Sequence, residues 1–212
     1  MSAVIIDGIS GAGKTLLLQG LQRVAQEQVP NYSKLIITEH MTERFFEKVT
    51  PSVCDVHTHV ARILRLVDQL QLVRAAGPFA THDRILTIAV ERLFLTLISR
   101  RLMTSDFFVQ EAELIASLKL RHVFLVVPDE QIEERIARSL SHRTKAWADY
   151  VDSLGGLRGA VQYFSARQTD MTEANAQLPD SITRKTLEIF ELEQLKDNEL
   201  LEELLWSRHS LS

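Results

Sequence analysis

Near its start the chain reads Ala3-Val4-Ile5-Ile6-Asp7-Gly8-Ile9-Ser10-Gly11-Ala12-Gly13-Lys14-Thr15. An apolar, strand-like run thus leads into a loop that fits G-x-x-x-x-G-K-[ST], the phosphate-binding loop or P loop. Residues 16–24 then have the composition of a helix. The order strand, glycine loop, helix predicts an α/β fold in which the loop joins the first strand of a parallel sheet to the first helix.

The residues of the loop suggest separate tasks in binding a nucleotide. Three glycines let the backbone turn its N–H groups inward around phosphate oxygens. Lys14 brings a positive charge to the β- and γ-phosphates, and the Thr15 hydroxyl can ligate Mg²⁺. The amino terminus of the following helix adds its dipole. We therefore expect the phosphates to be held by Gly8, Ser10, Gly11, Ala12, Gly13, Lys14 and Thr15. The alternative, a chance glycine-rich turn that opens a helix, leaves the adjacent lysine and hydroxyl unexplained.

Length and composition limit the class of protein. The chain has 212 residues, of which 45% are hydrophobic and 25% charged, and we expect one domain over residues 1–212. A single cysteine excludes an internal disulfide and favours a reducing compartment. A first strand that starts at residue 3 leaves no room for a signal peptide, and no apolar run reaches membrane-spanning length. We expect a cytoplasmic protein with neither a membrane nor a nucleic-acid polymer as its partner. Because the net charge is −4, positive charge for phosphate binding must be concentrated locally.

Apolar runs alternate with helical stretches along the chain, the pattern of a parallel sheet covered by helices. Strands are predicted at residues 3–7, 35–38, 78–82, 122–127 and 185–190. Helices are predicted at residues 13–28, 55–76, 88–103, 106–118, 129–140, 146–178 (interrupted at Gly155-Gly156) and 193–206.

Two strand ends carry chemistry-bearing residues. In open parallel sheets, ligands bind outside the carboxyl ends of the strands, where the P loop also lies. Glu39 follows the second predicted strand, and it could take a proton from an attacking hydroxyl or ligate Mg²⁺ indirectly. After the third predicted strand, Asp83 could hold the water shell of Mg²⁺ and Arg84 could bind a phosphate bidentately. The alternatives are a surface acid that caps a helix, and an Asp-Arg pair in a strand-end turn.

A segment rich in arginine follows the fourth predicted strand. Arg135 and Arg138 are three residues apart and share a helix face, and Arg143 comes shortly after them. Phosphoryl transfer asks mainly for positioning and positive charge around the moving group. We expect a lid at about residues 135–148, with Arg138 acting in the transfer and Arg135 and Arg143 binding the nucleotide. The alternative is a salt-bridged surface helix, since Glu133 and Glu134 lie alongside.

Other side chains give weaker signals. Cys54, His57 and His59 are close in sequence but lack a second ligand pair in zinc spacing, so we expect no zinc site. The aromatic side chains of Phe45, Phe46 and Trp147 could stack on a base, but aromatic residues at helical spacing are more often part of the core.

Taken together, the stretch 7–15, Glu39, Asp83-Arg84 and residues 135–143 resemble the thymidylate kinase-like and deoxynucleoside kinase branch of the P-loop kinases. The resemblance spans most of the chain and implies a three-layer fold with a five-stranded parallel sheet. It also implies ATP with Mg²⁺ as donor, an acceptor pocket between helices 55–76 and 106–118, and a homodimer built on long helices. Under this resemblance Glu39 is the catalytic base, and the acid–arginine pair of the family maps to Asp83 and Arg84.

Departures from the family pattern leave the acceptor open. Ser10 stands where thymidylate kinases carry an acid, His40 where they carry a proline, and Leu16 where they carry a second hydroxyl residue. The leading interpretation is transfer of the γ-phosphoryl group of ATP to a nucleoside or nucleoside monophosphate. The first alternative is transfer to an antibiotic-like, natural-product or sugar hydroxyl. The second is a nucleotide-dependent switch or ATPase module. Against the switch, the sequence has no N-K-x-D signature, and its D-x-x-G after the loop falls in a predicted helix at residues 152–155.

Overall fold

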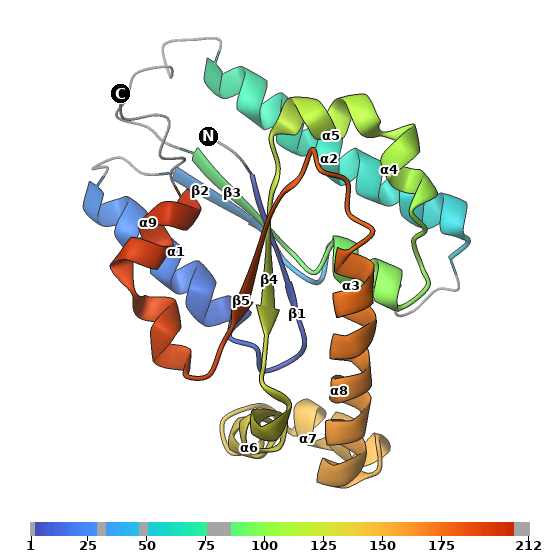
Figure 1. The fold of residues 1–212 in the computed structure, drawn as a ribbon, viewed down its shortest axis with the longest axis vertical. Helices are drawn as coiled ribbons and strands as arrows, with labels where there is room; N and C mark the ends of the chain where they lie inside the picture. Colours follow the sequence, from blue (N-terminus) through green and yellow to red (C-terminus); the bar gives the residue numbers. More distant parts are fainter. Residues whose placement is uncertain (1–2, 29–32, 47–50, 76–85, 206–212) are drawn as a thin grey trace.

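Five parallel strands form the sheet of the computed structural model, which describes residues 3–28, 33–46, 51–75 and 86–205 (Figure 1). Across the sheet the strands are ordered β2-β3-β1-β4-β5, and all neighbouring strands are parallel. The predicted α/β class with a five-stranded parallel sheet is therefore confirmed. The strands are β1 (Val4–Gly8), β2 (Ser33–Ile37), β3 (Leu86–Glu91), β4 (Arg121–Val126) and β5 (Thr183–Glu188).

Helices cover both faces of the sheet, which gives three layers (Figure 1). Further helices lie at the carboxyl ends of the strands. One face carries α1 (Lys14–Gln28) and α9 (Asn198–Leu205), which pack together. At the carboxyl ends of the strands lie α6 (Asp129–Leu140) and α7 (Lys145–Ser153). The other face carries α2 (Val53–Ala75), α3 (Phe94–Ser99), α4 (Asp106–Gln110), α5 (Ala112–Leu118) and α8 (Gly156–Asn175). Within the described residues no helix is both long and apolar enough to cross a bilayer.

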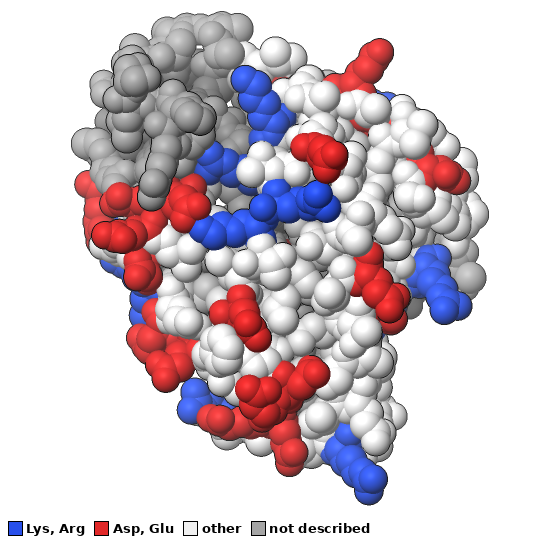
Figure 2. All heavy atoms as spheres, in the orientation of Figure 1, with Lys and Arg blue, Asp and Glu red and all other residues white. Residues whose placement is uncertain are grey.

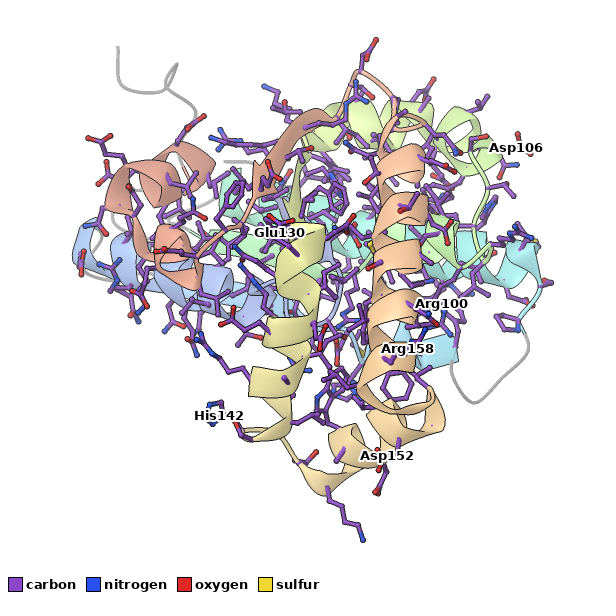
Figure 3. All side chains as sticks on the ribbon, turned by 60° about the horizontal axis from the view of Figure 1, so that its bottom comes forward. Arg100, Asp106, Glu130, His142, Asp152 and Arg158 are labelled. Carbon is purple, nitrogen blue, oxygen red and sulfur yellow. The ribbon has the colours of Figure 1, made fainter. Side chains whose placement is uncertain are left out.

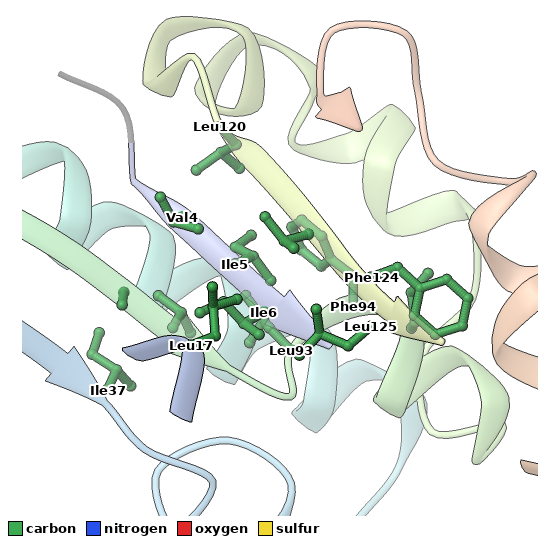
Figure 4. Close-up of a cluster of buried hydrophobic side chains, with 14 of the residues drawn as sticks. Val4, Ile5, Ile6, Leu17, Ile37, Leu93, Phe94, Leu120, Phe124 and Leu125 are labelled. Carbon is green, nitrogen blue, oxygen red and sulfur yellow. The ribbon is translucent and has the colours of Figure 1, made fainter. Parts of the chain in front are cut away.

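The core is built around the two central strands. Ile5 and Ile6 of β1 and Leu125 of β4 have no measurable exposure, because helices cover both faces of these strands (Figure 4). From α1, Leu17 and Leu21 point into the same core at helical spacing. Burial of this kind removes apolar surface from water and is the main favourable term in folding. It also fixes the position of the loop between β1 and α1.

The register of the sheet brings three loops to one place. Ile6 of β1 is level with Glu91 of β3, and Ile37 of β2 is level with Val90. The residues that follow β2 and β3 therefore leave the sheet beside the P loop, which follows β1. Polar side chains on these loops share one edge of the sheet, as expected for a parallel α/β fold.

The third strand is where the sequence prediction is wrong. Residues 88–103 were expected to form one helix, but β3 occupies 86–91 and a short α3 follows at 94–99. Ile88, Ala89 and Val90 are buried because β3 lies between β1 and β2. A strand buried on both faces shows no alternation of polar and apolar residues, and its pattern does not distinguish it from a buried helix. The predicted strand at 78–82 lies outside the described residues.

The remaining predicted elements are observed with small shifts at their ends. The helix expected over 106–118 is divided at Glu111 into α4 and α5. The long helix expected over 146–178 is interrupted at Gly155 and Gly156, as predicted, and their φ angles are +94° and +72°. In place of one helix over 193–206 there is a 3₁₀ turn, η2 (Leu192–Lys196), followed by α9.

Candidate active site

The P loop forms a cradle at the end of β1. Gly13 has a φ of +95°, a left-handed conformation that costs glycine little, and a Cβ there would lie 2.5 Å from Leu195 Cδ1. At Gly8 a Cβ would lie 2.7 Å from the carbonyl oxygen of Leu125 on the neighbouring strand. Packing and backbone conformation thus both require glycine at these two positions. The loop leads directly into α1, whose amino terminus points toward the cradle.

Lys14 lies buried inside this cradle. Its Nζ donates hydrogen bonds to the carbonyl oxygens of Gly8, at 2.7 Å, and Ile9, at 2.8 Å. Burial, with the nearby positive charge of Arg92, lowers the pKa of Lys14 to about 7. An anion in the cradle would stabilise the charged form of this lysine. The next residue, Thr15, is exposed toward the neighbouring cavity.

A cavity of about 1000 Å³ opens over the P loop. Its walls come from the P loop, the segments after β2 and β3, the helices α6 and α7, which hold the predicted lid, and the segment after β5. Lys14, Arg44, Arg92, Arg135, Arg138 and Arg143 line it, together with several glutamates. On the face shown in Figure 2, by contrast, acidic side chains gather over α6 and α9. Positive charge is thus placed at the cavity of a protein whose net charge is −4.

Arg92, directly after β3, connects the P loop with the segment after β2. Its Nη2 donates to Ser10 Oγ at 3.2 Å, and its Nη1 donates to Glu43 Oε2 at 2.7 Å. Its Nε lies 2.8 Å from Glu39 Oε2, an ion pair in which the N–H is not aligned for a hydrogen bond. Arg92 has a φ of +53°, a left-handed conformation that is uncommon for a residue with a side chain. Such a conformation is held by its surroundings and is enriched at functional sites.

Glu39 lies in the same cavity as the P loop, fixed between two arginines. One carboxylate oxygen is 2.8 Å from Arg44 Nε and the other is 2.8 Å from Arg92 Nε. The side chain keeps an exposed fraction of 23%, so a carboxylate oxygen remains accessible from the cavity. The position is that expected for the end of β2. Its carboxylate is oriented by two charges rather than left free on the surface.

The acid–arginine pair predicted after the third strand stays a prediction. Asp83 and Arg84 lie outside the described residues, and their assignment depended on a strand ending at residue 82. The observed third strand ends at Glu91, so the residues that enter the cavity from it are Glu91 and Arg92. The signal that could have found them is the short apolar run 88–90 directly before an acid and an arginine.

The arginines of the lid have three different environments. Arg135 packs beside Gly11 and donates to the carbonyl oxygens of Ile189 and Phe190, while its Nη1 is buried without a hydrogen-bond partner. Burial lowers the pKa of Arg135. Arg138 is exposed and pairs with Glu134 at 3.3 Å. This contact is a surface ion pair, as in the salt-bridged surface helix that was the alternative to a lid.

Arg143 also lines the cavity. Its guanidinium lies 4.6 Å from the centre of the Trp147 ring. Burial and the positive charge of Arg92 lower the pKa of Arg143, and the carboxylate of Glu39 acts in the other direction. Trp147 itself donates from Nε1 to Ser139 Oγ and stacks on Phe164, so it joins the lid to α8. Of the three lid arginines, Arg143 is the one whose charge is coupled to the Arg92–Glu39 pair.

A second cavity, of about 360 Å³, lies between the amino-terminal part of α2 and α4. The sequence analysis expected an acceptor pocket between these helices. His57 and Cys54 line this cavity, but no residue is shared with the lining of the P-loop cavity. Phe46 is buried, and Phe45 stacks on His59. Among the described residues, no three His, Cys, Asp or Glu side chains are grouped as a metal site.

Asp7, the residue before the P loop, is completely buried. Its carboxylate accepts hydrogen bonds from the Thr96 hydroxyl at 2.7 Å and from the backbone N–H groups of Leu95 and Thr96. His122 Nε2 on β4 lies 3.0 Å away. Burial alone would raise the pKa of Asp7, but these partners lower it overall. Asp7 thereby joins β1, β4 and the amino terminus of α3, and so fixes the loop that carries Arg92.

Comparison with known proteins finds solved structures that align with the chain. Neither a protein-family model nor a curated protein sequence matches the chain. Among solved structures, the thymidylate kinase of Candida albicans aligns over 96% of this chain and 90% of its own, with 14% identical residues and a TM-score of 0.47. Identity at this level does not transfer a substrate or an activity. Only the geometry of the site can indicate the function of this protein.

Proposed function

We propose that the protein is a P-loop phosphotransferase that moves the γ-phosphoryl group of ATP to a hydroxyl or phosphate of a small acceptor of nucleoside or nucleotide type. The observation that carries the proposal is Arg92, which contacts Ser10 of the P loop and Glu39 at the same time. A phosphate-binding loop and a carboxylate held beside it are the two parts that phosphoryl transfer to an acceptor needs.

The residues of the cavity fit ATP and Mg²⁺. Lys14 is buried with only carbonyl partners, and Arg135 keeps a buried N–H group without an acceptor, so both can bind additional anionic or polar groups. Thr15 and Glu91 line the cavity and would contribute oxygen ligands to Mg²⁺. Mg²⁺ is commonly bound by few protein ligands together with phosphates and water. When bound, it would neutralise charge on the phosphates.

Each remaining residue then has a defined task. Lys14 would hold the phosphate that transfers, and Arg143 would approach it from the lid. Glu39 would accept the proton of an attacking hydroxyl, with its orientation maintained by Arg44 and Arg92. Arg138, which points to solvent and pairs with Glu134, would act in the transfer only after the lid moves.

The test is acceptor-dependent turnover of ATP with Mg²⁺, measured over a panel of nucleosides, nucleotides and hydroxylated metabolites. Lys14→Ala is expected to lower kcat/KM by about 10²–10³-fold, because the lysine meets phosphate charge in a site that excludes water. Lys185→Ala, which removes a surface ion pair with Glu203, is the matched control and should keep full activity. Near-normal turnover in folded Lys14→Ala protein would refute the proposal. Turnover that needs a macromolecule instead would support the switch alternative.

A further inference from the structure

Glu43 is a buried carboxylate surrounded by three arginines. Its Oε2 accepts from Arg92 Nη1 at 2.7 Å, and its Oε1 accepts from Arg100 Nη1 at 2.9 Å. Arg167 Nη2 lies 3.7 Å from the same Oε1. These arginines come from the end of β3, the end of α3 and the middle of α8, and Figure 3 shows Arg100 beside α8. The side chain of Glu43 has an exposed fraction of only 10%.

The position of Glu43 is fixed by its own turn. The preceding residue, Thr42, is fully buried, and its hydroxyl donates to the carbonyl oxygen of Glu91 at 2.7 Å. Burial alone would raise the pKa of Glu43, but Arg92, Arg100 and Arg167 lower it overall. The carboxylate is therefore ionised at neutral pH and acts as the counter-charge of the arginine cluster.

This counter-charge occupies Arg92, an arginine that lines the cavity over the P loop. Bidentate recognition of a phosphate uses two parallel N–H groups of one guanidinium. The three nitrogens of Arg92 face Glu39, Glu43 and Ser10. A phosphate at Arg92 would have to displace Glu43, which would leave a buried carboxylate without one of its partners. Removing one partner from a buried charge pair is strongly unfavourable.

We propose that Glu43 is a specificity-determining residue that excludes phosphate from the cluster of Arg92, Arg100 and Arg167, so that the acceptor is uncharged where it meets Arg92. The inference rests on the proposed phosphoryl transfer and narrows its acceptor to a hydroxyl compound, such as a nucleoside, rather than a monophosphate. Glu39 is then the carboxylate that meets the hydroxyl, and Glu43 is the internal anion that takes the place of a substrate phosphate.

The first test measures phosphate binding without turnover. Lys14→Ala protein removes the main cation of the P loop, so a titration with inorganic phosphate reports on the arginine cluster. We expect phosphate to raise the Tm of protein that carries both Lys14→Ala and Glu43→Gln, and to leave the Tm of Lys14→Ala protein unchanged. Glu43→Asp in the same background keeps the anion and should behave like Lys14→Ala alone. Asp180→Asn, in an exposed pair with Arg184, is the control for the loss of one negative charge.

The second test measures specificity. Wild-type protein should prefer a nucleoside to its 5′-monophosphate, and Glu43→Gln should raise the ratio of kcat/KM for monophosphate over nucleoside by about tenfold to hundredfold, the effect of a freed charge-assisted contact. A wild-type protein that prefers the monophosphate would overturn the inference. So would equal phosphate binding with and without Glu43→Gln. If no acceptor is phosphorylated, the proposed function is refuted, but the role of Glu43 is not, because phosphate binding is measured separately. If Glu43→Gln protein does not fold, the preference of the wild-type protein for nucleoside or monophosphate still decides the role of Glu43.

Discussion

Replacing Arg92 with lysine tests whether one guanidinium holds the site together. Lysine keeps the charge but has a single nitrogen, which can satisfy one of the three contacts. The contacts at stake are those with Glu43 at 2.7 Å, Ser10 at 3.2 Å and Glu39 at 2.8 Å. Glu43 would retain Arg100 and Glu39 would retain Arg44, so neither carboxylate becomes isolated.

The size of the effect follows from these contacts. A hydrogen bond to a charged group contributes about 1.5–3 kcal/mol, and one between neutral partners about 1 kcal/mol. The Arg92 side chain has an exposed fraction of 16%, so solvent screening reduces these values little. We expect Arg92→Lys to lower the free energy of unfolding by about 3–6 kcal/mol, since one carboxylate contact and the Ser10 hydrogen bond are lost and the charged guanidinium is the donor in both. We expect kcat to fall by about 10–100-fold, because displacement of a catalytic group by about 1 Å has effects of this order.

Urea denaturation and steady-state kinetics on the same preparation measure the two effects. Arg184→Lys, which alters an exposed pair with Asp180, should change stability by less than about 0.5 kcal/mol. A double-mutant cycle with Glu39→Gln then measures the coupling between Arg92 and Glu39. If Arg92 acts through Glu39, Arg92→Lys should lower kcat little further in protein that already carries Glu39→Gln. Multiplicative losses in kcat, or an Arg92→Lys protein with wild-type stability and kcat, would refute the reasoning.

Three further predictions concern single residues. Glu39→Gln should lower kcat by about 10²–10⁴-fold, measured by initial rates, while ATP affinity stays within a few-fold, measured by titration calorimetry. An unchanged kcat per folded molecule would mean that Glu39 has only a structural role. Since burial lowers the pKa of Lys14 to about 7 and a bound phosphate must raise it, the lysine should take up most of a proton on nucleotide binding at pH 8 and little at pH 6. Calorimetry in buffers of different ionisation enthalpy measures this uptake, and equal values at both pH values would contradict it. Asp7→Asn should lower the free energy of unfolding by about 3 kcal/mol, because an amide cannot accept from Leu95, Thr96 and His122 together; a urea-measured loss below about 1 kcal/mol would be inconsistent with this network.

The acid stability of the fold has a defined direction. Asp7 and Glu43 both have a pKa that is lower in the folded protein than in the unfolded chain. Their stabilising contribution is therefore complete above the ordinary carboxyl pKa values and is lost as the pH falls through the folded ones. Lys14 acts in the same direction at higher pH: because its pKa is also lowered on folding, its contribution makes stability rise between about pH 7 and its unfolded value of 10.5.

The sequence by itself determined the parts of the fold that depend on neighbours in the chain. The order of apolar run, glycines, lysine and threonine at residues 3–15 specifies a strand, a tight loop and a helix start, because glycine at positive φ and a helix amino terminus are local requirements. Glu39 was placed correctly at the carboxyl end of the second strand for a similar reason. Strand ends in a parallel sheet all lie at one edge, so position along the chain predicts position in space.

Only the tertiary structure decided where the third strand lies and which residues it brings to the site. The run 86–91 becomes a strand because it fills the space between β1 and β2, a property of the sheet and not of the segment. The partners of Glu43 come from positions 49, 57 and 124 residues further along the chain, at Arg92, Arg100 and Arg167. No local pattern encodes such a contact, since burial and charge pairing arise only when separate elements pack together. Glu43, which no motif in the sequence singles out, is in the folded protein the buried counter-charge of three arginines.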